Sequence, residues 1–180
     1  GAGLNVPLWI LGSSLYGAEL AAHFGLPYAF ASHFAPTDLR QALHLYRQNF
    51  KPSRQLEKPY VMAAMNLQAA DTREEADVIV TSLMQGVLGL ARGMPIKLPP
   101  PVDGFAERLG PQEKAAISRF MTHTALGDAR DVKERLREFQ YETEADEIIL
   151  TAQIFDHQAR LHAFEIAAEA MEALSKSDSS

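Results

Sequence analysis

Short apolar runs of strand length alternate with segments of helical periodicity along this chain, and no other feature restricts its fold as strongly. Each run is bounded by turn-forming residues, and the four runs occupy residues 6–11, 28–32, 60–67 and 148–152. Strands that are joined through helices must cross over, so the alternation predicts a parallel sheet with right-handed connections. Four such units fit either a small open sheet or one half of an eight-stranded barrel.

Helix start and stop signals support this division. The first helix is expected between Ser14 and Gly25, and Thr37 is expected to cap a second helix that ends near Asn49. Two overlapping capping boxes in residues 71–75 predict a helix that continues to about residue 92. Asp128 and Asp156 are the expected caps of two later helices.

Residues 94–111 interrupt the alternation, because this stretch contains five of the ten prolines and has little regular periodicity. It is expected to be an ordered excursion or a mobile loop, and a helix is predicted directly after it at 111–121. Residues 1–174 are therefore interpreted as one domain that carries an insertion at about 94–121 before the last strand. The polar residues 175–180 are expected to form a disordered tail.

Composition restricts the partners and the compartment of the protein. The 180 residues are 47% apolar and carry a net charge of −6, so attraction to nucleic acid or to an anionic membrane surface is not expected. The absence of cysteine excludes disulfides and thiolate metal sites. No apolar stretch approaches the roughly 20 residues that span a bilayer, so a cytoplasmic protein is expected.

Ligands of α/β proteins bind beyond the carboxyl ends of the strands, and Gly12, Ser13 and Ser14 follow the first strand. A flexible residue followed by two hydroxyls at a helix N-terminus suits a phosphate, because unpaired N–H groups and the helix dipole favour an anion there. The alternative interpretation is that one of the serines only caps the helix.

Ser32 and His33 follow the second strand in the same way. His33 is a candidate catalytic residue because histidine titrates near neutral pH, but a histidine bonded to neighbouring backbone is the competing interpretation. Asn66–Gln68 and Gln153–His157 also lie at strand ends. No histidine spacing is typical of a metal site, so none is predicted.

Two long motifs give the chain a family resemblance. Residues 6–18 read VPLWILGSSLYGA and residues 25–36 read GLPYAFASHFAP, and both closely resemble bacterial luciferase-like, flavin-dependent monooxygenases of the single-component type. Shorter matches follow in the same order, at residues 46–47, 50–53, 70–72, 145–147 and 155–160.

The resemblance implies the C-terminal half of a (β/α)8 TIM-type barrel, in which the four runs would be strands five to eight. It also implies cofactor contacts: phosphate contacts by Ser13 and Ser14 after Gly12, with backbone near Tyr16 and Gly17, and contacts near the flavin ring or the substrate by Ala31, Ser32 and His33. The expected cofactor is reduced FMN, which a separate reductase could supply, with the deazaflavin F420 as the alternative.

The activity implied by the resemblance is oxygenation of a small organic substrate with reduced flavin and O2. Because a complete barrel needs about 250 residues, the chain is expected to pair with a missing N-terminal half or to form a homo-oligomer. Two other interpretations are open. One is a non-catalytic half barrel that binds flavin or phosphate, and the other is a structural module that dimerises.

Overall fold

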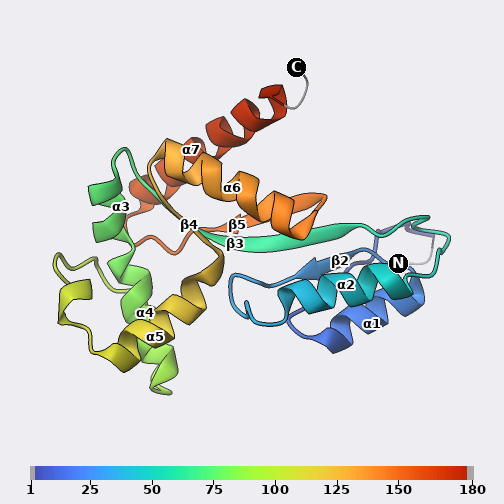
Figure 1. Ribbon diagram of the computed structural model, residues 1–180, viewed down its shortest axis with the longest axis horizontal. Helices are drawn as coiled ribbons and strands as arrows, with labels where there is room; N and C mark the ends of the chain where they lie inside the picture. Colours follow the sequence, from blue (N-terminus) through green and yellow to red (C-terminus); the bar gives the residue numbers. More distant parts are fainter. Residues whose placement is uncertain (1–2, 178–180) are drawn as a thin grey trace.

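The computed structural model describes residues 3–177 as a twisted parallel sheet with helices between the strands (Figure 1). The strands are β1 (Ile10–Gly12), β2 (Tyr28–Phe30), β3 (Val61–Ala69), β4 (Thr124–Gly127) and β5 (Glu147–Thr151). The helices are α1 (Leu15–Phe24), α2 (Leu39–Asn49), α3 (Arg73–Ile79), α4 (Thr81–Ala91), α5 (Pro111–Phe120), α6 (Ala129–Thr143) and α7 (His157–Ser177), with 3-10 turns η1 (Ala106–Arg108) and η2 (Met121–His123).

The long strand β3 pairs in parallel with three other strands. Met62 and Ala63 pair with β2 and also with β5, so these two strands lie on opposite edges of β3. Asn66 pairs with both Thr124 of β4 and Thr151 of β5, which places β4 on the same edge as β2 but further along. The main sheet therefore has the order β1-β2-β3-β5, and β4 extends the edge beyond the end of β2.

This order confirms the predicted run of parallel strands joined by helices. Each of the four main strands overlaps one of the four apolar runs, and the Pro-rich and helical segment precedes the last of them, as predicted. Strand β4 was not expected. It is only four residues long and lies between two helices, so it shows no strand pattern of its own and forms by pairing with the end of β3.

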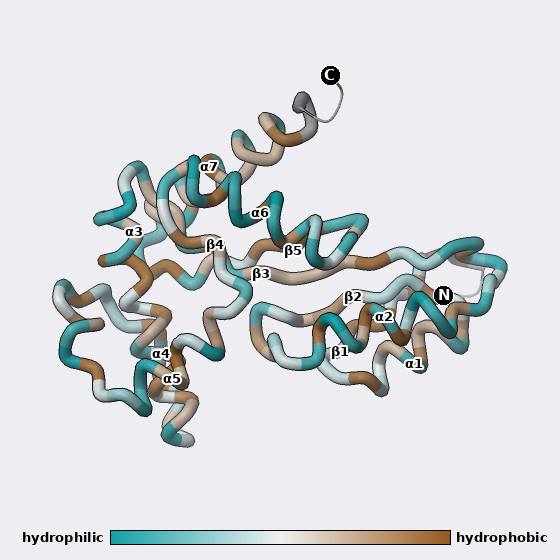
Figure 2. Tube along the Cα trace, viewed as in Figure 1, coloured by the Kyte–Doolittle hydropathy of each residue, from teal (hydrophilic) through white to brown (hydrophobic). Residues whose placement is uncertain are grey.

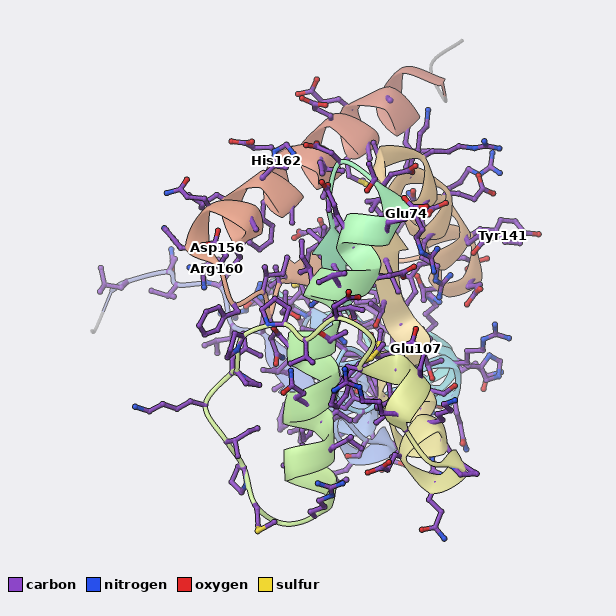
Figure 3. All side chains as sticks on the ribbon, turned by 90° about the vertical axis from the view of Figure 1, so that its left-hand side faces the viewer. Glu74, Glu107, Tyr141, Asp156, Arg160 and His162 are labelled. Atoms are coloured by element: carbon purple, nitrogen blue, oxygen red, sulfur yellow. The ribbon has the colours of Figure 1, made fainter. Side chains whose placement is uncertain are left out.

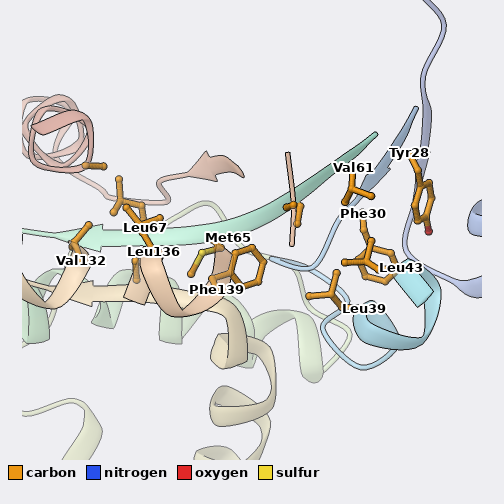
Figure 4. Close-up of a cluster of buried hydrophobic side chains, with 14 of the residues drawn as sticks. Tyr28, Phe30, Leu39, Leu43, Val61, Met65, Leu67, Val132, Leu136 and Phe139 are labelled. Carbon is orange, nitrogen blue, oxygen red and sulfur yellow. The ribbon is translucent and has the colours of Figure 1, made fainter. Parts of the chain in front are cut away.

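Four helices cover one face of the sheet. Tyr28, Phe30 and the odd-numbered residues of β3 point to this face and form a single apolar cluster with α1, α2, α6 and α7. Figure 4 shows Met65 of β3 close to Leu136 and Phe139 of α6, whose burial matches the predicted helical spacing. In Figure 2 the apolar colours of β3 contrast with the hydrophilic colours on much of α6.

Several local predictions were wrong. The first strand begins at Ile10 rather than residue 6, and Val6, Leu8 and Leu11 are exposed, since β1 is paired only with β2 and nothing described covers its other face. The second helix begins at Leu39, with Asp38 instead of Thr37 at the N-cap position.

The helix predicted from the capping boxes to residue 92 is two helices, α3 and α4, which meet at Val80. Its predicted start is confirmed, because the Thr72 hydroxyl accepts a hydrogen bond from the Glu75 backbone N–H at 3.2 Å. The second box is not formed as expected, since Asp71 pairs with a histidine of α7 instead.

The insertion is attached to α4 by side-chain hydrogen bonds. Thr81 Oγ1 accepts from the Val102 backbone N–H at 2.8 Å, and Gln85 Nε2 donates to the Pro100 carbonyl at 3.1 Å. Arg92 forms an ion pair with Glu113 across the ends of the segment. These contacts favour the ordered alternative for the insertion.

The C-terminal helix α7 includes residues 175–177 of the expected tail, and residues 178–180 lie outside the described part of the chain. Within residues 3–177, none of the helices combines the length and the apolar character that a membrane crossing requires.

Gly25 ends α1 in the left-handed conformation, with φ of 63°. We expect Gly25→Ala to lower the free energy of unfolding by about 1–3 kcal/mol or more, because a Cβ there would overlap the Lys51 carbonyl oxygen in addition to the cost of the backbone conformation. Gly86→Ala is the matched control, since Gly86 lies inside α4 with open space around it. That variant should be more stable by up to about 1 kcal/mol. Denaturant unfolding measures both, and equal effects of the two substitutions would contradict this account.

Candidate functional site

The turn between β1 and α1 brings Gly12 against Gly17. A Cβ atom added to Gly12 would lie 3.3 Å from the Gly17 Cα, and one added to Gly17 would lie 3.2 Å from the Gly12 Cα. The Tyr28 ring packs against both positions, and its hydroxyl donates to the Ser14 carbonyl at 3.2 Å. Burial raises the Tyr28 pKa to about 12, so this hydroxyl keeps its proton. Small residues and a buried tyrosine therefore fix the turn.

The two serines of this turn are exposed. Ser14 occupies the N-cap position of α1, but its side chain makes no capping hydrogen bond. No acidic residue lies in the first turn of the helix. The first-turn N–H groups and the positive end of the dipole thus lie at the same helix start as the exposed residues Ser13 and Ser14. Such a set of donors fits a phosphate group.

The ends of β1 and β2 are joined through the backbone, since the Ala31 N–H donates to the Gly12 carbonyl at 2.9 Å. Ser32 is fully buried, and its hydroxyl donates to the Ala64 carbonyl at 2.5 Å. The Ser32 hydroxyl proton is therefore engaged in a hydrogen bond between two strands of the protein. Of the predicted residues after β2, Ala31 and His33 are the more accessible ones.

His33 is partly buried beside the end of β3. Burial lowers its pKa below the usual value, so the imidazole is neutral at pH 7. Its carbonyl accepts a hydrogen bond from Asn66 Nδ2 at 2.9 Å, whereas its buried Nδ1 has no partner within the described residues. The backbone of His33 is thus structural, and its ring has an unused polar atom.

Two buried polar residues of β3 were not predicted as site residues, although the strand end that contains them was. Asn66 Oδ1 accepts from Thr151 Oγ1 at 3.2 Å, which links β2, β3 and β5 through one side chain. Gln68 donates to the Gln153 carbonyl at 3.4 Å, and its Oε1 is buried without a partner among the described residues. The sequence could have indicated these residues, because Asn66 and Gln68 are polar, lie two positions apart and therefore share one face of an otherwise apolar strand.

An apolar pocket of about 200 Å3 lies next to these residues. Phe34 follows His33, and Gln153 bonds to Gln68, so both connect the pocket to the strand ends. The other walls come from α4, α5 and the insertion, namely Leu83, Gly86, Val87, Leu90, Pro95, Ile96, Leu98 and Phe120. Apolar walls with a few polar groups at one end are typical of a small-molecule site.

A second and larger pocket, of about 520 Å3, lies between α3 and α7 at the end of β3. Ala70, Val78 and Ile79 form apolar walls, and Glu74 and His162 line it from the two helices (Figure 3). His162 Nε2 lies 2.7 Å from Asp71 Oδ1, and its Nδ1 lies 3.1 Å from Glu165 Oε2. Both ring nitrogens face carboxylates, which is the arrangement of an imidazolium.

The start of α7 has a structural explanation. Asp156 Oδ1 accepts a hydrogen bond from the Ala159 N–H at 2.8 Å, so the residue is a helix cap, as predicted. One turn on, Arg160 contacts His157 Nδ1 at 2.9 Å. Figure 3 shows Asp156 and Arg160 at the start of α7. Among residues 3–177, no group of three or more potential ligand side chains is placed to hold a metal ion.

These features define a class: a parallel α/β half barrel with an exposed, serine-containing turn after β1 and an apolar pocket near the ends of β2 and β3. Comparison with known proteins gives the family. The sequence profile of the luciferase-like monooxygenase family matches residues 1–147, and the chain belongs to that family.

The chain is 49% identical over 174 residues to a luciferase-like monooxygenase of Escherichia coli K12, which covers 97% of this chain and 52% of the relative. It is 43% identical over 169 residues to the uncharacterized protein YvbT of Bacillus subtilis, covering 94% and 50% of the two chains. The crystal structure of apo-MsnO8 superposes with a TM-score of 0.75 at 26% identity, over 95% of this chain and 56% of that one. Other structurally similar proteins include flavoprotein 390 and F420-dependent enzymes, at 12–14% identity. The chain thus spans about half the length of the relatives it matches.

The His162 contacts generate a pH prediction. Hydrogen bonds to Asp71 and then Glu165 raise the His162 pKa, so the stabilisation is complete below the unfolded value of about 6.5 and is lost as the pH rises through the higher folded value. We expect His162→Gln to be least stable relative to the parent protein at pH 5.5–6.5, with the difference shrinking at alkaline pH.

Unfolding by urea at a series of pH values measures this effect. His44→Gln is the control, because it removes an exposed histidine of α2 that contacts no carboxylate within the described residues. A difference between parent and His162→Gln that grows with pH would contradict the assignment.

Proposed function

We propose that this chain is the C-terminal portion of a flavin-dependent monooxygenase, which uses reduced flavin and O2 to oxygenate a small organic substrate. The observation that carries the proposal is the β1–α1 turn, where Ser14 is at the N-cap position without capping and both hydroxyls are exposed. This turn lies at the carboxyl edge of the sheet in a chain that belongs to the luciferase-like monooxygenase family.

The residues of the turn fit the phosphate of FMN, which is the cofactor we propose. Ser13 and Ser14 would donate through their hydroxyls, and the N–H groups near Tyr16 and Gly17 would add backbone donors. The close contact of Gly12 with Gly17 leaves no side chain to crowd the anion. F420 is the alternative, because it also carries a phosphate.

Beyond the phosphate, Ala31 and His33 would contact the ring of the cofactor or the substrate, since both are partly accessible after the end of β2. When bound, the reduced flavin supplies the electrons that activate O2. His33 offers a neutral imidazole nitrogen, and Gln68 offers an amide oxygen that has no partner within the described residues. The pocket behind Phe34 and Gln153 would exclude water from an apolar part of the substrate.

A complete site requires a partner for the open half of the barrel. The outer edges of β1 and β5 are unpaired among the described strands, and Leu11 and Ile149, which point away from the helix layer, are 73% and 47% exposed. We infer that an N-terminal half barrel covers this face and pairs with both edges, with a second copy of the chain as the alternative.

Ser14→Asp tests the phosphate assignment. We expect it to weaken FMN binding at least tenfold, because the carboxylate repels the phosphate, while helix α1 is retained since aspartate is a good N-cap residue. Ser14→Asn is the matched control, because it has nearly the same shape without the charge and should bind within a few fold of the parent protein. Flavin fluorescence titration measures both, and equal affinities of the two variants would refute the phosphate site.

Reconstitution tests the proposed incompleteness. The chain is mixed or co-expressed with the N-terminal half of the E. coli relative, and flavin affinity and O2 uptake with reduced FMN are compared with free flavin and with each half alone. We expect tighter binding and O2 uptake different from that of free flavin only when both halves are present. Flavin binding without any such change in either state would favour the non-catalytic half barrel, and a stable dimer of the single chain would favour self-pairing.

A further inference from the structure

Three arginines from three different helices meet at one pocket on the helix side of the fold. Arg40 of α2, Arg119 of α5 and Arg135 of α6 line a pocket of about 460 Å3, together with Glu142 at the end of α6. Counting the charged lining residues gives three positive groups and one negative group, a local charge of +2 in a chain whose net charge is −6. The pocket is therefore a positive site on an acidic protein.

The carboxylates nearby neutralise only part of this charge. Arg40 Nη2 lies 3.2 Å from Glu142 Oε2, and Arg135 Nη1 lies 3.6 Å from the other oxygen of the same carboxylate. Arg135 also contacts Glu138, which does not line the pocket. Within residues 3–177, no carboxylate lies within ion-pair distance of the Arg119 guanidinium, so this group is free to bind a ligand.

The pKa of a buried histidine, His123, is lowered by burial and by two of these arginines. His123 lines the pocket and is 7% exposed, and its Nδ1 has no hydrogen-bond partner among the described residues. Burial and then the charge of Arg135 lower its pKa, Arg40 adds to the effect, and the Pro36 carbonyl and Glu142 oppose it. The ring is held in place against Phe139 at a centroid distance of 5.2 Å.

We propose that this pocket binds the phosphate or carboxylate groups of a small anionic metabolite, at a site separate from the turn that would hold the flavin phosphate. Guanidinium groups bind both oxyanions through paired hydrogen bonds, and convergent arginines are stabilised when an anion offsets their repulsion. The volume falls within the range of about 300–1,000 Å3 that is typical of small-molecule sites.

Calorimetric titration at low salt with pyrophosphate and with citrate distinguishes the two chemistries. It is performed on Ser14→Asp protein, in which the turn before α1 is closed to anions. We expect saturable binding, and Arg119→Met should weaken it about tenfold or more through the loss of one charge-assisted contact. Arg130→Met is the matched control, since Arg130 is an exposed arginine of α6 outside the pocket. Arg119→Glu, which reverses the charge, should abolish binding.

The His123 ring gives a second readout. A bound anion would offset the charges of Arg40 and Arg135, so saturation with the anion should raise the His123 pKa measured by NMR. This rise should be smaller in Arg119→Met than in the protein that retains Arg119. Thermal unfolding checks that the variants are folded. No saturable heat with either anion, or equal affinities of Arg119→Met and Arg130→Met, would overturn the proposal. Failure of the flavin phosphate site would leave the result at this pocket unchanged.

Discussion

The pairing of β3 with three strands is the constraint on which the rest of the structure depends. Its first residues hold β2 and β5 on opposite edges, and its last residues hold β4. Its odd-numbered side chains supply the apolar face for four helices, while Asn66 and Gln68 carry polar groups to the opposite face. A one-residue shift of register would exchange these two faces. The register of β3 thus determines both the apolar core and the positions of Asn66 and Gln68 in the candidate site.

Much of this organisation is encoded locally. The four apolar runs, the Gly25 stop and the Asp128 and Asp156 caps are short-range patterns; each run contributes residues to a strand, and the stop and both caps are formed. Strand β4 was not predictable in this way, because a four-residue segment becomes a strand only when β3 extends beyond β2 to receive it. The predicted length of the first strand was wrong for the opposite reason. Its apolar residues are typical of a strand, but part of the pairing that such residues need is not provided by the described chain.

The site residues divide along the same line. The exposure of Ser13 and Ser14 follows from their place in a turn, which sequence position alone indicates. By contrast, the use of the Ser32 hydroxyl by the Ala64 carbonyl depends on the distance between two strands, and no local pattern reveals it. The role of Asn66 could not be predicted for the same reason, because its side chain bonds to His33 and Thr151, which lie on other segments of the chain.

The two parts of the proposed flavin site differ in how complete they are. The phosphate turn is formed by β1, α1 and Tyr28, so its donors are positioned by this chain alone. The region beyond His33 is open on the side of Leu11 and Ile149, where an apolar face and two strand edges are exposed. A flavin held by its phosphate would therefore be anchored here, but its ring would be shielded from water only from one side. Anchoring and shielding are separable in this fold, and the second requires the surface that covers the open face.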